Sequence, residues 1–384
     1  MDSPLLYLLN VSNPDRISSD SGWVFADVLL PALADCGVNV VLASPSPVTD
    51  ARVRWLRTQS PLTKYHARFD NDCARLRELL AEANPRIIVA NQIEQVPAIR
   101  AAMLAAHIDV PVVGYCHYLP FYLDPAGRIV KDPSLDDGGL WQSVVLQFLG
   151  GLHACDRVMV HSATALEWVE RAADLMSVPI PADVFVVPPA RHPATVAQSG
   201  AVRAAAGDGG AAVYNHRLYA HYGTADFVAL AARLRCQIWV MDVMGDRNDA
   251  RVGLDPSPEV FRGQLDRLPH VSVLSDNGDR DTYRSILARA DFGLAPFRPG
   301  CTWSMSVVDC QAMGVPVVAP RMAWMREAVA EDLLFDELSQ AAEIADRLLG
   351  DDEFWACQSA HAAETTQRLA PELIAEEYLK AVAW

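Results

Sequence analysis

The chain has 384 residues, of which 51% are hydrophobic and 21% charged, and its 48 acidic and 32 basic side chains give a formal net charge of −16. This length favours two domains, each large enough to bury a core, and the composition excludes a disordered or fibrous chain. The acidic balance argues against a protein that binds nucleic acid over its whole surface, because such proteins need a basic face.

The sequence also indicates compartment and metal content. It has no apolar run long enough to span a membrane, and its first residues lack the basic start of a signal peptide, so we expect a cytoplasmic protein. The eight cysteines form no Cys-x-x-Cys pair and no metal-ligand spacing with the ten histidines. We therefore expect reduced thiols and no metal site.

The first half of the chain alternates short apolar runs with amphipathic stretches. Strands are predicted at 5–9, 38–43, 86–90, 111–115 and 157–160, and helices at 23–35, 70–83, 95–107, 140–153 and 163–175. Continuous Val, Ile and Leu runs between helices are typical of parallel strands that are covered on both faces. Residues 1–190 are therefore predicted to form a Rossmann-like, doubly wound α/β domain.

A second alternation follows a break in composition. Prolines around Pro188 and then a Gly, Ala and Ser tract predict a linker at 191–210. A second Rossmann-like domain is predicted at 211–365. A last helix within 366–384 is expected to pack back across the junction. Within 211–365 the predicted strands are 211–214, 237–241, 271–274, 292–295 and 315–319, and the predicted helices are 224–235, 281–289 and 304–313.

The predicted fold class is thus α/β, with two Rossmann-like doubly wound domains that face each other across a cleft. In such folds ligands bind outside the carboxyl ends of the strands. The residues that follow the predicted strands are therefore the first candidates for a functional site.

The segment Gly300–Ser306 is the most informative of these loops. It reads Gly-Cys-Thr-Trp-Ser-Met-Ser and leads from a strand into a helix. Such a small-residue loop offers backbone N–H groups and the positive end of a helix dipole, which suit a diphosphate. Asp309 lies just over one turn into the helix, where a carboxylate can accept hydrogen bonds from ribose hydroxyls. An ordinary strand-loop-helix with a surface aspartate fits the same spacing.

This segment resembles the donor-site signature of the family 4 glycosyltransferases of the GT-B fold. That signature is Glu, seven residues, Glu, and then a helix that closes in Gly-x-Pro-Val-Val-Ala, as Gly314–Ala319 does here. The second Glu falls on Asp309, which the resemblance assigns to the ribose. The first falls on Cys301, which departs from the carboxylate that contacts the transferred sugar. The donor-binding residues expected in this segment are Cys301, Trp303, Ser304, Met305, Ser306 and Asp309.

A second match begins the second domain. Residues 215–223 read Asn-His-Arg-Leu-Tyr-Ala-His-Tyr-Gly and are similar to the family pattern Gly-Arg-Leu, three residues, Lys-Gly, in which Arg and Lys clamp the donor diphosphate. Arg217 keeps its place and is expected to be catalytic, while Tyr222 replaces the Lys. His216 or His221 is expected to compensate for that charge. The His-Arg pair is also similar to the tRNA-queuosine mannosyltransferases.

Two positions of the first domain complete the expected site. Gly22 lies in the loop Ser18–Trp23 after the first strand, and His117 follows the strand at 111–115. In the family a glycine at this turn approaches the donor, and a His at the second place touches the sugar. A plain turn and a structural histidine are the alternatives. The loops Cys116–Tyr122 and Asn91–Gln95 are expected to shape the acceptor side.

The expected activity is transfer of a sugar from a nucleotide diphosphate sugar to a hydroxyl acceptor, with retention of configuration and without a metal or cofactor. Asp279-Arg280-Asp281 offers the DxD of metal-dependent transferases, but its place before a helix favours capping. One alternative is a transferase that acts on a modified base of tRNA or of phage-type hydroxymethylpyrimidine DNA. Another is a GT-B epimerase or a silent binding module. The sugar, the acceptor and the oligomeric state are left open.

The charge is distributed unevenly over these regions. The net charge is −7 over residues 1–190, +2 over 191–326 and −11 over 327–384. The segment that is expected to bind a diphosphate is therefore slightly positive, as an anion site requires. For this reason a polynucleotide stays open as an acceptor.

Overall fold

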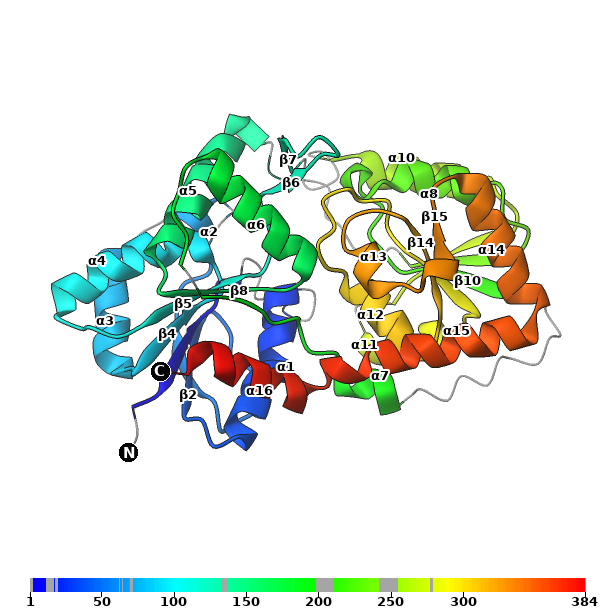
Figure 1. Cartoon of the computed structure of the whole chain (residues 1–384). Coiled ribbons are helices and arrows are strands. Elements are labelled where there is room, and N and C mark those ends of the chain that lie inside the picture. Colours follow the sequence, from blue (N-terminus) through cyan, green and yellow to red (C-terminus); the bar gives the residue numbers. More distant parts are fainter. Residues whose placement is uncertain are drawn as a thin grey trace. The chain divides into compact units, whose positions relative to one another are not determined.

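The computed structural model describes residues 3–11, 17, 20–61, 63, 65–69, 72–132, 135, 137–181, 183–197, 210–241, 255–276 and 279–383. It divides into two compact units: residues 1–190 together with 371–384 form the first unit, and residues 191–370 form the second. Each unit is a parallel sheet with helices packed around it (Figure 1). The predicted α/β class with two Rossmann-like units is confirmed.

The first unit is built on a seven-stranded sheet of order β3-β2-β1-β4-β5-β8-β9, in which all neighbours are parallel. Its strands are β1 (Leu5–Leu8), β2 (Val40–Ser44), β3 (Arg54–Arg57), β4 (Ile87–Ala90), β5 (Val112–Cys116), β8 (Arg157–Val160) and β9 (Val184–Val186). Strands β1, β2, β4 and β5 are buried along their whole length, as their apolar runs predict. In β3 only Leu56 is buried, so the apolar pattern of the sequence does not reveal this edge strand.

The helices of the first unit come from both ends of the chain. They are α1 (Ser21–Asp35), α2 (His66–Phe69), α3 (Cys73–Ala83), η2 (Ile93–Gln95), α4 (Val96–Ala106), η4 (Asp137–Gly139), α5 (Trp141–Ala154), α6 (Ala163–Leu175) and α16 (Pro371–Val382), and β6 (Phe121–Leu123) pairs with β7 (Ile129–Lys131) as a hairpin. Helix α16 packs along α1 (Figure 1). The buried Tyr378 ring of α16 lies 6.3 Å from the ring of Tyr115 in β5. The C-terminal helix thus completes the core of the first unit.

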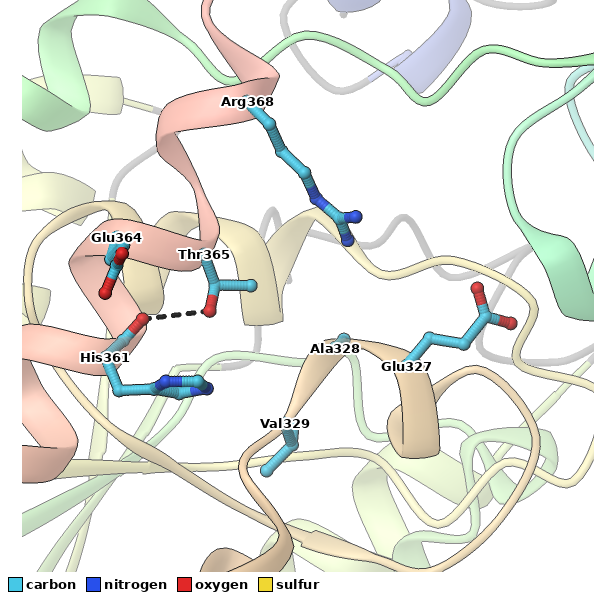
Figure 2. Close-up of a pocket in the computed structure, with 7 residues that line it drawn as sticks. All are labelled: Glu327, Ala328, Val329, His361, Glu364, Thr365 and Arg368. Atoms are coloured by element: carbon cyan, nitrogen blue, oxygen red, sulfur yellow. Dashed lines mark hydrogen bonds between the residues drawn. The ribbon is translucent and has the colours of Figure 1, made fainter.

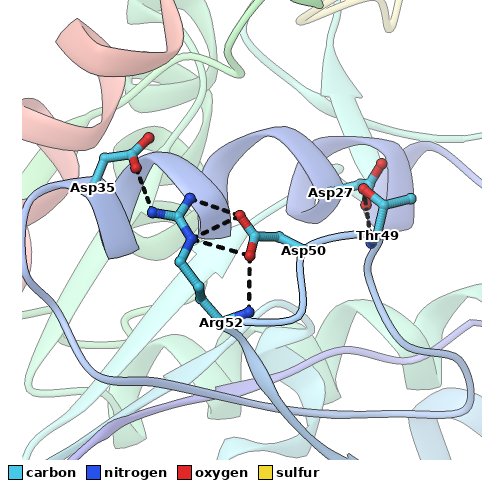
Figure 3. Close-up of polar contacts among 5 residues, drawn as sticks. All are labelled: Asp27, Asp35, Thr49, Asp50 and Arg52. Carbon is cyan, nitrogen blue, oxygen red and sulfur yellow. Dashed lines mark hydrogen bonds and ion pairs between the residues drawn. The ribbon is translucent and has the colours of Figure 1, made fainter.

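Side-chain contacts tie the loop between β2 and β3 to α1 (Figure 3). Arg52 forms ion pairs of 2.6 Å with Asp35 and with Asp50, and the hydrogen bonds that Arg52 donates to Asp50 hold the pKa of Asp50 below its usual value. The backbone N and the hydroxyl of Thr49 both donate to Asp27, at 2.6 and 2.8 Å. Because these pairs are exposed, they contribute little to stability. Their effect is to fix the path of the loop.

The second unit is built on a six-stranded parallel sheet of order β12-β11-β10-β13-β14-β15. Its strands are β10 (Ala211–Tyr214), β11 (Gln237–Met241), β12 (Val271–Leu274), β13 (Phe292–Leu294), β14 (Val317–Pro320) and β15 (Leu334–Phe335). Its helices are α7 (Pro193–Ala197), η5 (Ala220–Tyr222), α8 (Thr224–Ala231), α10 (Ser257–Leu265), α11 (Arg280–Leu287), α12 (Met305–Ala312), α13 (Met325–Ala328), η6 (Glu331–Leu333), α14 (Leu338–Gly350), α15 (Asp352–Thr365) and η7 (Gln367–Leu369). The second sheet has the strand order 3-2-1-4-5-6 of dinucleotide-binding folds, and the first sheet has the same order with a seventh strand added after the sixth.

The start of the second unit differs from the expected linker. Residues 193–197 form α7, which packs on α12, and the backbone N of Arg191 donates to the Leu369 carbonyl at 2.8 Å. The rest of the expected linker, 198–209, lies outside the described residues.

The eight cysteines are free thiols, and five of them are buried. Over the described part of the chain, no helix has both the length and the apolar character needed to cross a membrane.

Candidate functional site

The second unit brings both expected donor motifs to one edge of its sheet. In a doubly wound sheet, ligands bind at the carboxyl ends of the strands where the strand order reverses. Here that point lies between β10 and β13, which are neighbours in the sheet. The loop after β10 holds residues 215–223, and the loop after β13 leads through 300–306 into α12. Two segments that are about 80 residues apart in the sequence therefore meet at the switch point.

A chain of buried hydrogen bonds joins these motifs. Asn215 donates from Nδ2 to the Ser306 carbonyl at 3.0 Å and to the hydroxyl of Tyr283 at 2.9 Å. Tyr283, on α11, donates in turn to Oδ2 of Asp309 at 3.0 Å. Neither Asn215 nor Tyr283 is predicted from the sequence as a site residue. Asn215 could have been included because it begins the matched motif, whereas Tyr283 has no such signal.

Asp309 is a buried carboxyl group and not a surface aspartate. Only 7% of the residue is exposed. Burial raises its pKa to about 6, against the opposing effects of Arg280, of the Tyr283 hydrogen bond and of Arg284. The alternative that Asp309 is a surface aspartate of an ordinary strand-loop-helix is therefore excluded. Asp309 is held in place by one hydrogen bond and ionises close to neutral pH, so its carboxylate suits hydroxyl donors such as those of a ribose.

The first turn of α12 is arranged for an anion. Ser304 caps the helix by accepting from the Val307 backbone N at 3.4 Å. The backbone N–H groups of Met305 and Ser306 lie in the same turn, where a helix has no internal acceptors. Trp303 borders this turn: its Nε1 lies 3.1 Å from the Met305 sulfur, and its ring lies 4.5 Å from the ring of Trp324.

Cys301 brings no negative charge to this loop. The residue is 4% exposed, and its Sγ lies 3.5 Å from the Trp303 carbonyl. Burial raises the pKa of the thiol to about 11. The position that is a carboxylate in the resembled pattern is therefore a neutral thiol at neutral pH.

The loop after β10 combines one arginine with a group of rings. Arg217 is half-buried between His216 and the fully buried Leu218. The ring of His221 stacks on Tyr219 with the centroids 5.3 Å apart, and lies 4.8 Å from the ring of Tyr222. Tyr222 therefore belongs to an aromatic cluster in the same loop as Arg217.

His216 is a neutral residue in this site. It is 4% exposed, its ring is hydrogen-bonded to the Leu294 backbone, and burial lowers its pKa to about 3. Its Nε2 has no hydrogen-bond partner within the part of the chain that the structure describes. The expectation that His216 supplies the charge missing at Tyr222 is wrong, because an imidazole with this pKa is uncharged at neutral pH.

In the first unit, Gly22 lies in the turn after β1, at the switch point between β1 and β4, and His117 follows β5, the next strand of the sheet. The hydroxyl of Ser21 lies 2.9 Å from Nε2 of His117. A Cβ added to Gly22 would lie 3.2 Å from the amide nitrogen of Asn91, so a side chain at position 22 would crowd the end of β4. Ser18 and Ser19 of the expected loop lie outside the described residues.

The N-terminus of α1 is already capped by a carboxylate. Asp20 accepts from the Trp23 backbone N at 3.0 Å. A negative charge at this position competes with a phosphate for the same helix end. The structure therefore favours α12, and not α1, as the helix whose N-terminus faces a diphosphate.

His117 is suited to hydrogen bonding and not to proton transfer. Burial lowers its pKa to about 4, and its Nδ1 is buried without a hydrogen-bond partner among the residues described. His161, on the neighbouring strand end, is also buried, with Nδ1 2.8 Å from the Cys116 carbonyl. Both rings are uncharged at neutral pH.

A buried ion pair fixes the two expected acceptor loops. Arg68 on α2 lies 3.2 Å from Glu94 in η2, and these residues are 8% and 1% exposed. The hydroxyl of Tyr118 is hydrogen-bonded to both, and the Arg68 guanidinium lies 4.5 Å above the Tyr118 ring. The loops Asn91–Gln95 and Cys116–Tyr122 are therefore held in one arrangement.

A separate pocket of about 300 Å³ lies between α13 and α15 of the second unit (Figure 2). It is lined by Glu327, Ala328, Val329, His361, Glu364, Thr365 and Arg368. None of the expected site residues lines it. It lies apart from both donor-like motifs in the sequence, so it is not a candidate for the diphosphate.

Comparison with known proteins shows the fold. No protein-family model and no curated protein sequence matches the chain. Among solved structures it is similar to sucrose-phosphate synthase from Thermosynechococcus elongatus, with 15% identity, a TM-score of 0.73, and coverage of 99% of this chain and 98% of the other. It is also similar to Anabaena HepE in complex with UDP, with 13% identity, a TM-score of 0.70 and coverage of 99% of both chains. Trehalose-6-phosphate synthase gives 14% identity, a TM-score of 0.72 and coverage of 98% of both. The chain therefore has the GT-B fold, as its motifs predict.

Proposed function

We propose that the protein is a glycosyltransferase that moves a sugar from a nucleotide diphosphate sugar to a hydroxyl acceptor. The observation that carries this proposal is the buried chain from Asn215 through Tyr283 to Asp309, which joins two donor-like motifs at the switch point of the second unit. The similar HepE structures are complexes with UDP and with UDP-glucose, which supports a nucleotide sugar as the donor.

In this proposal the second unit binds the donor nucleotide. Asp309 accepts hydrogen bonds from the ribose hydroxyls. Arg217 and the first-turn amides of α12 bind the diphosphate, and they stabilise its charge as the bond to the sugar breaks. These groups take the place of a metal ion, so turnover is expected to be metal-independent.

The proposed chemistry is retaining. The bond between the anomeric carbon and the diphosphate oxygen breaks, and a bond from the same carbon to the acceptor oxygen forms on the same face. The acceptor proton passes to the leaving phosphate, which departs as a nucleoside diphosphate. His117 fits this scheme because a neutral imidazole can hydrogen-bond a sugar hydroxyl without acting as an acid.

The test is turnover of purified protein with UDP-, GDP-, ADP- and dTDP-sugars and a panel of hydroxyl acceptors. Turnover is measured as release of the nucleoside diphosphate. We expect Arg217→Ala to lower kcat by about 100-fold or more, because it removes a charge that stabilises the leaving group. Arg289→Ala is the matched control, since Arg289 is exposed and lies just before β13, at the opposite end of the sheet. Wild-type activity in Arg217→Ala would contradict the assignment.

Product analysis separates the remaining possibilities. An anomeric configuration that matches the donor, measured by NMR, supports retention, and unchanged turnover in EDTA supports metal independence. Isomerised donor without transfer would indicate an epimerase. Binding of a nucleotide sugar without any turnover would indicate a silent module.

A further inference from the structure

One cation of the second unit has no role in the sequence motifs. Arg298 follows β13, the strand beside β10, and its guanidinium lies 5.4 Å from the centroid of the Tyr222 ring. Its positive charge also acts on the Cys301 thiol, whose pKa it lowers against the larger effect of burial. Arg298 therefore touches both positions at which the sequence departs from the resembled donor pattern.

The backbone around Arg298 is held on both sides. Arg298-Pro299-Gly300-Cys301 form a turn, in which the Cys301 backbone N donates to the Arg298 carbonyl at 3.0 Å. Proline at the second position of a turn fixes its φ in advance. The preceding residue, Phe297, is 6% exposed and packs on Phe335 with centroids 5.6 Å apart.

A close backbone contact sets Tyr222 beneath Arg298. Gly223 has a φ of +69°, and a Cβ there would lie only 2.3 Å from the Phe297 carbonyl oxygen. Only glycine permits this approach. The turn at 222–223 and the strand end at 297–298 are therefore locked together, and the stacking of Arg298 on Tyr222 follows from the backbone.

The charges around the site indicate what Arg298 binds. His216 is neutral and Cys301 is a neutral thiol. Arg298 shares a turn with Cys301, the position that contacts the transferred sugar in the resembled pattern, and this places Arg298 toward the sugar end of the proposed donor site. An arginine that stacks on an aromatic ring can still direct its N–H groups in the plane of the guanidinium toward phosphate oxygens.

We propose that Arg298 binds the distal phosphate of the donor, the one that carries the sugar, and that it supplies the charge that the resembled pattern has at position 222. This inference rests on the proposed donor site. It adds a second guanidinium to Arg217, placed by a neighbouring strand, and it assigns Tyr222 the role of a platform for that guanidinium.

The test compares nucleoside diphosphates with their monophosphates, which lack the distal phosphate. UDP, GDP, ADP, CDP and dTDP are titrated into wild-type protein by calorimetry, and the tightest-binding one is used with its monophosphate. We expect Arg298→Gln to weaken diphosphate binding by about 10- to 100-fold and to leave monophosphate binding unchanged. Arg289→Gln is the control, because Arg289 also stacks on a ring, that of Trp239 at 5.2 Å, but lies at the amino end of β13.

A second variant tests the charge itself. Adding Tyr222→Lys to Arg298→Gln restores a cation beside the same phosphate, and we expect it to recover part of the diphosphate affinity. Equal weakening of monophosphate and diphosphate in Arg298→Gln would indicate a structural role and overturn the inference, as would unchanged diphosphate binding. If wild-type protein binds none of the five diphosphates, the proposed donor site fails and this inference fails with it.

Discussion

Replacement of Asp309 by asparagine should separate the free-energy cost of burying this charged carboxyl group from its proposed role in ligand binding. Asparagine has nearly the same shape and can still accept the Tyr283 hydrogen bond, but it has no charge to desolvate. The pKa of Asp309 is raised from 3.8 to about 6 by burial. A difference of this size corresponds to about 3 kcal/mol of free energy between the ionised and protonated forms.

The sign of the effect follows from proton binding. Between pH 3.8 and about pH 6 the unfolded chain has lost the proton that native Asp309 still holds. This group therefore lowers stability as the pH rises through that window, and its stabilising contribution is fully present only below the unfolded pKa. We expect Asp309→Asn to match wild type near pH 4 and to be more stable than wild type by up to about 3 kcal/mol at pH 8.

The measurement is urea unfolding of both proteins at a series of pH values, followed by tryptophan fluorescence, to which Trp303 and Trp324 of the same unit contribute. Asp226→Asn is the control, because Asp226 is exposed in the first turn of α8. A stability difference between Asp309→Asn and wild type that is constant with pH would refute the reasoning. A nucleoside diphosphate is also titrated into wild-type protein at the same pH values. We expect its affinity to fall below about pH 6, where the Asp309 carboxylate becomes protonated.

Two further predictions concern stability. Gly223→Ala should destabilise the second unit by about 2–4 kcal/mol in urea, because its backbone is left-handed and its Cβ would meet Phe297, whereas Gly263→Ala, in open helix surface, should be neutral or stabilising by about 0.5–1 kcal/mol. Equal effects of the two glycine changes would count against the close contact. Glu94→Ala should cost about 3–5 kcal/mol in the same assay because it leaves the buried Arg68 without its carboxylate, and a loss below about 1 kcal/mol would contradict the buried pair.

The strands that follow most directly from the sequence are those whose side chains are buried on both faces. The apolar runs at 5–9, 86–90 and 111–115 correspond to β1, β4 and β5. The edge strand β3 was not predicted, because three of its four residues are exposed and its apolar pattern is correspondingly weak. Capping was also predictable: Asp279 caps α11 by accepting from the Thr282 backbone N at 2.7 Å, as its place before a helix indicated.

The candidate site was predictable only where its residues are close in sequence. The loop before α12 and the motif around Arg217 follow recognisable spacings. Tyr283 and Arg298 follow no such spacing. Each contacts a residue of another element, Asp309 and Tyr222 respectively, that only the fold brings close. The assignment of α16 to the first unit is likewise a matter of packing, since Tyr378 is buried against Tyr115 from a strand more than 250 residues earlier.

The sequence by itself determined the alternation of strands and helices, the two Rossmann-like halves and the loops that follow their strands, because these depend on local periodicity and backbone preference. Only the tertiary structure decided the charge state of the residues in those loops. Asp309, His216 and Cys301 have pKa values set by burial, and burial depends on chain segments that are distant in sequence. For the same reason only the fold placed a guanidinium over Tyr222, where the sequence alone showed the loss of a cation.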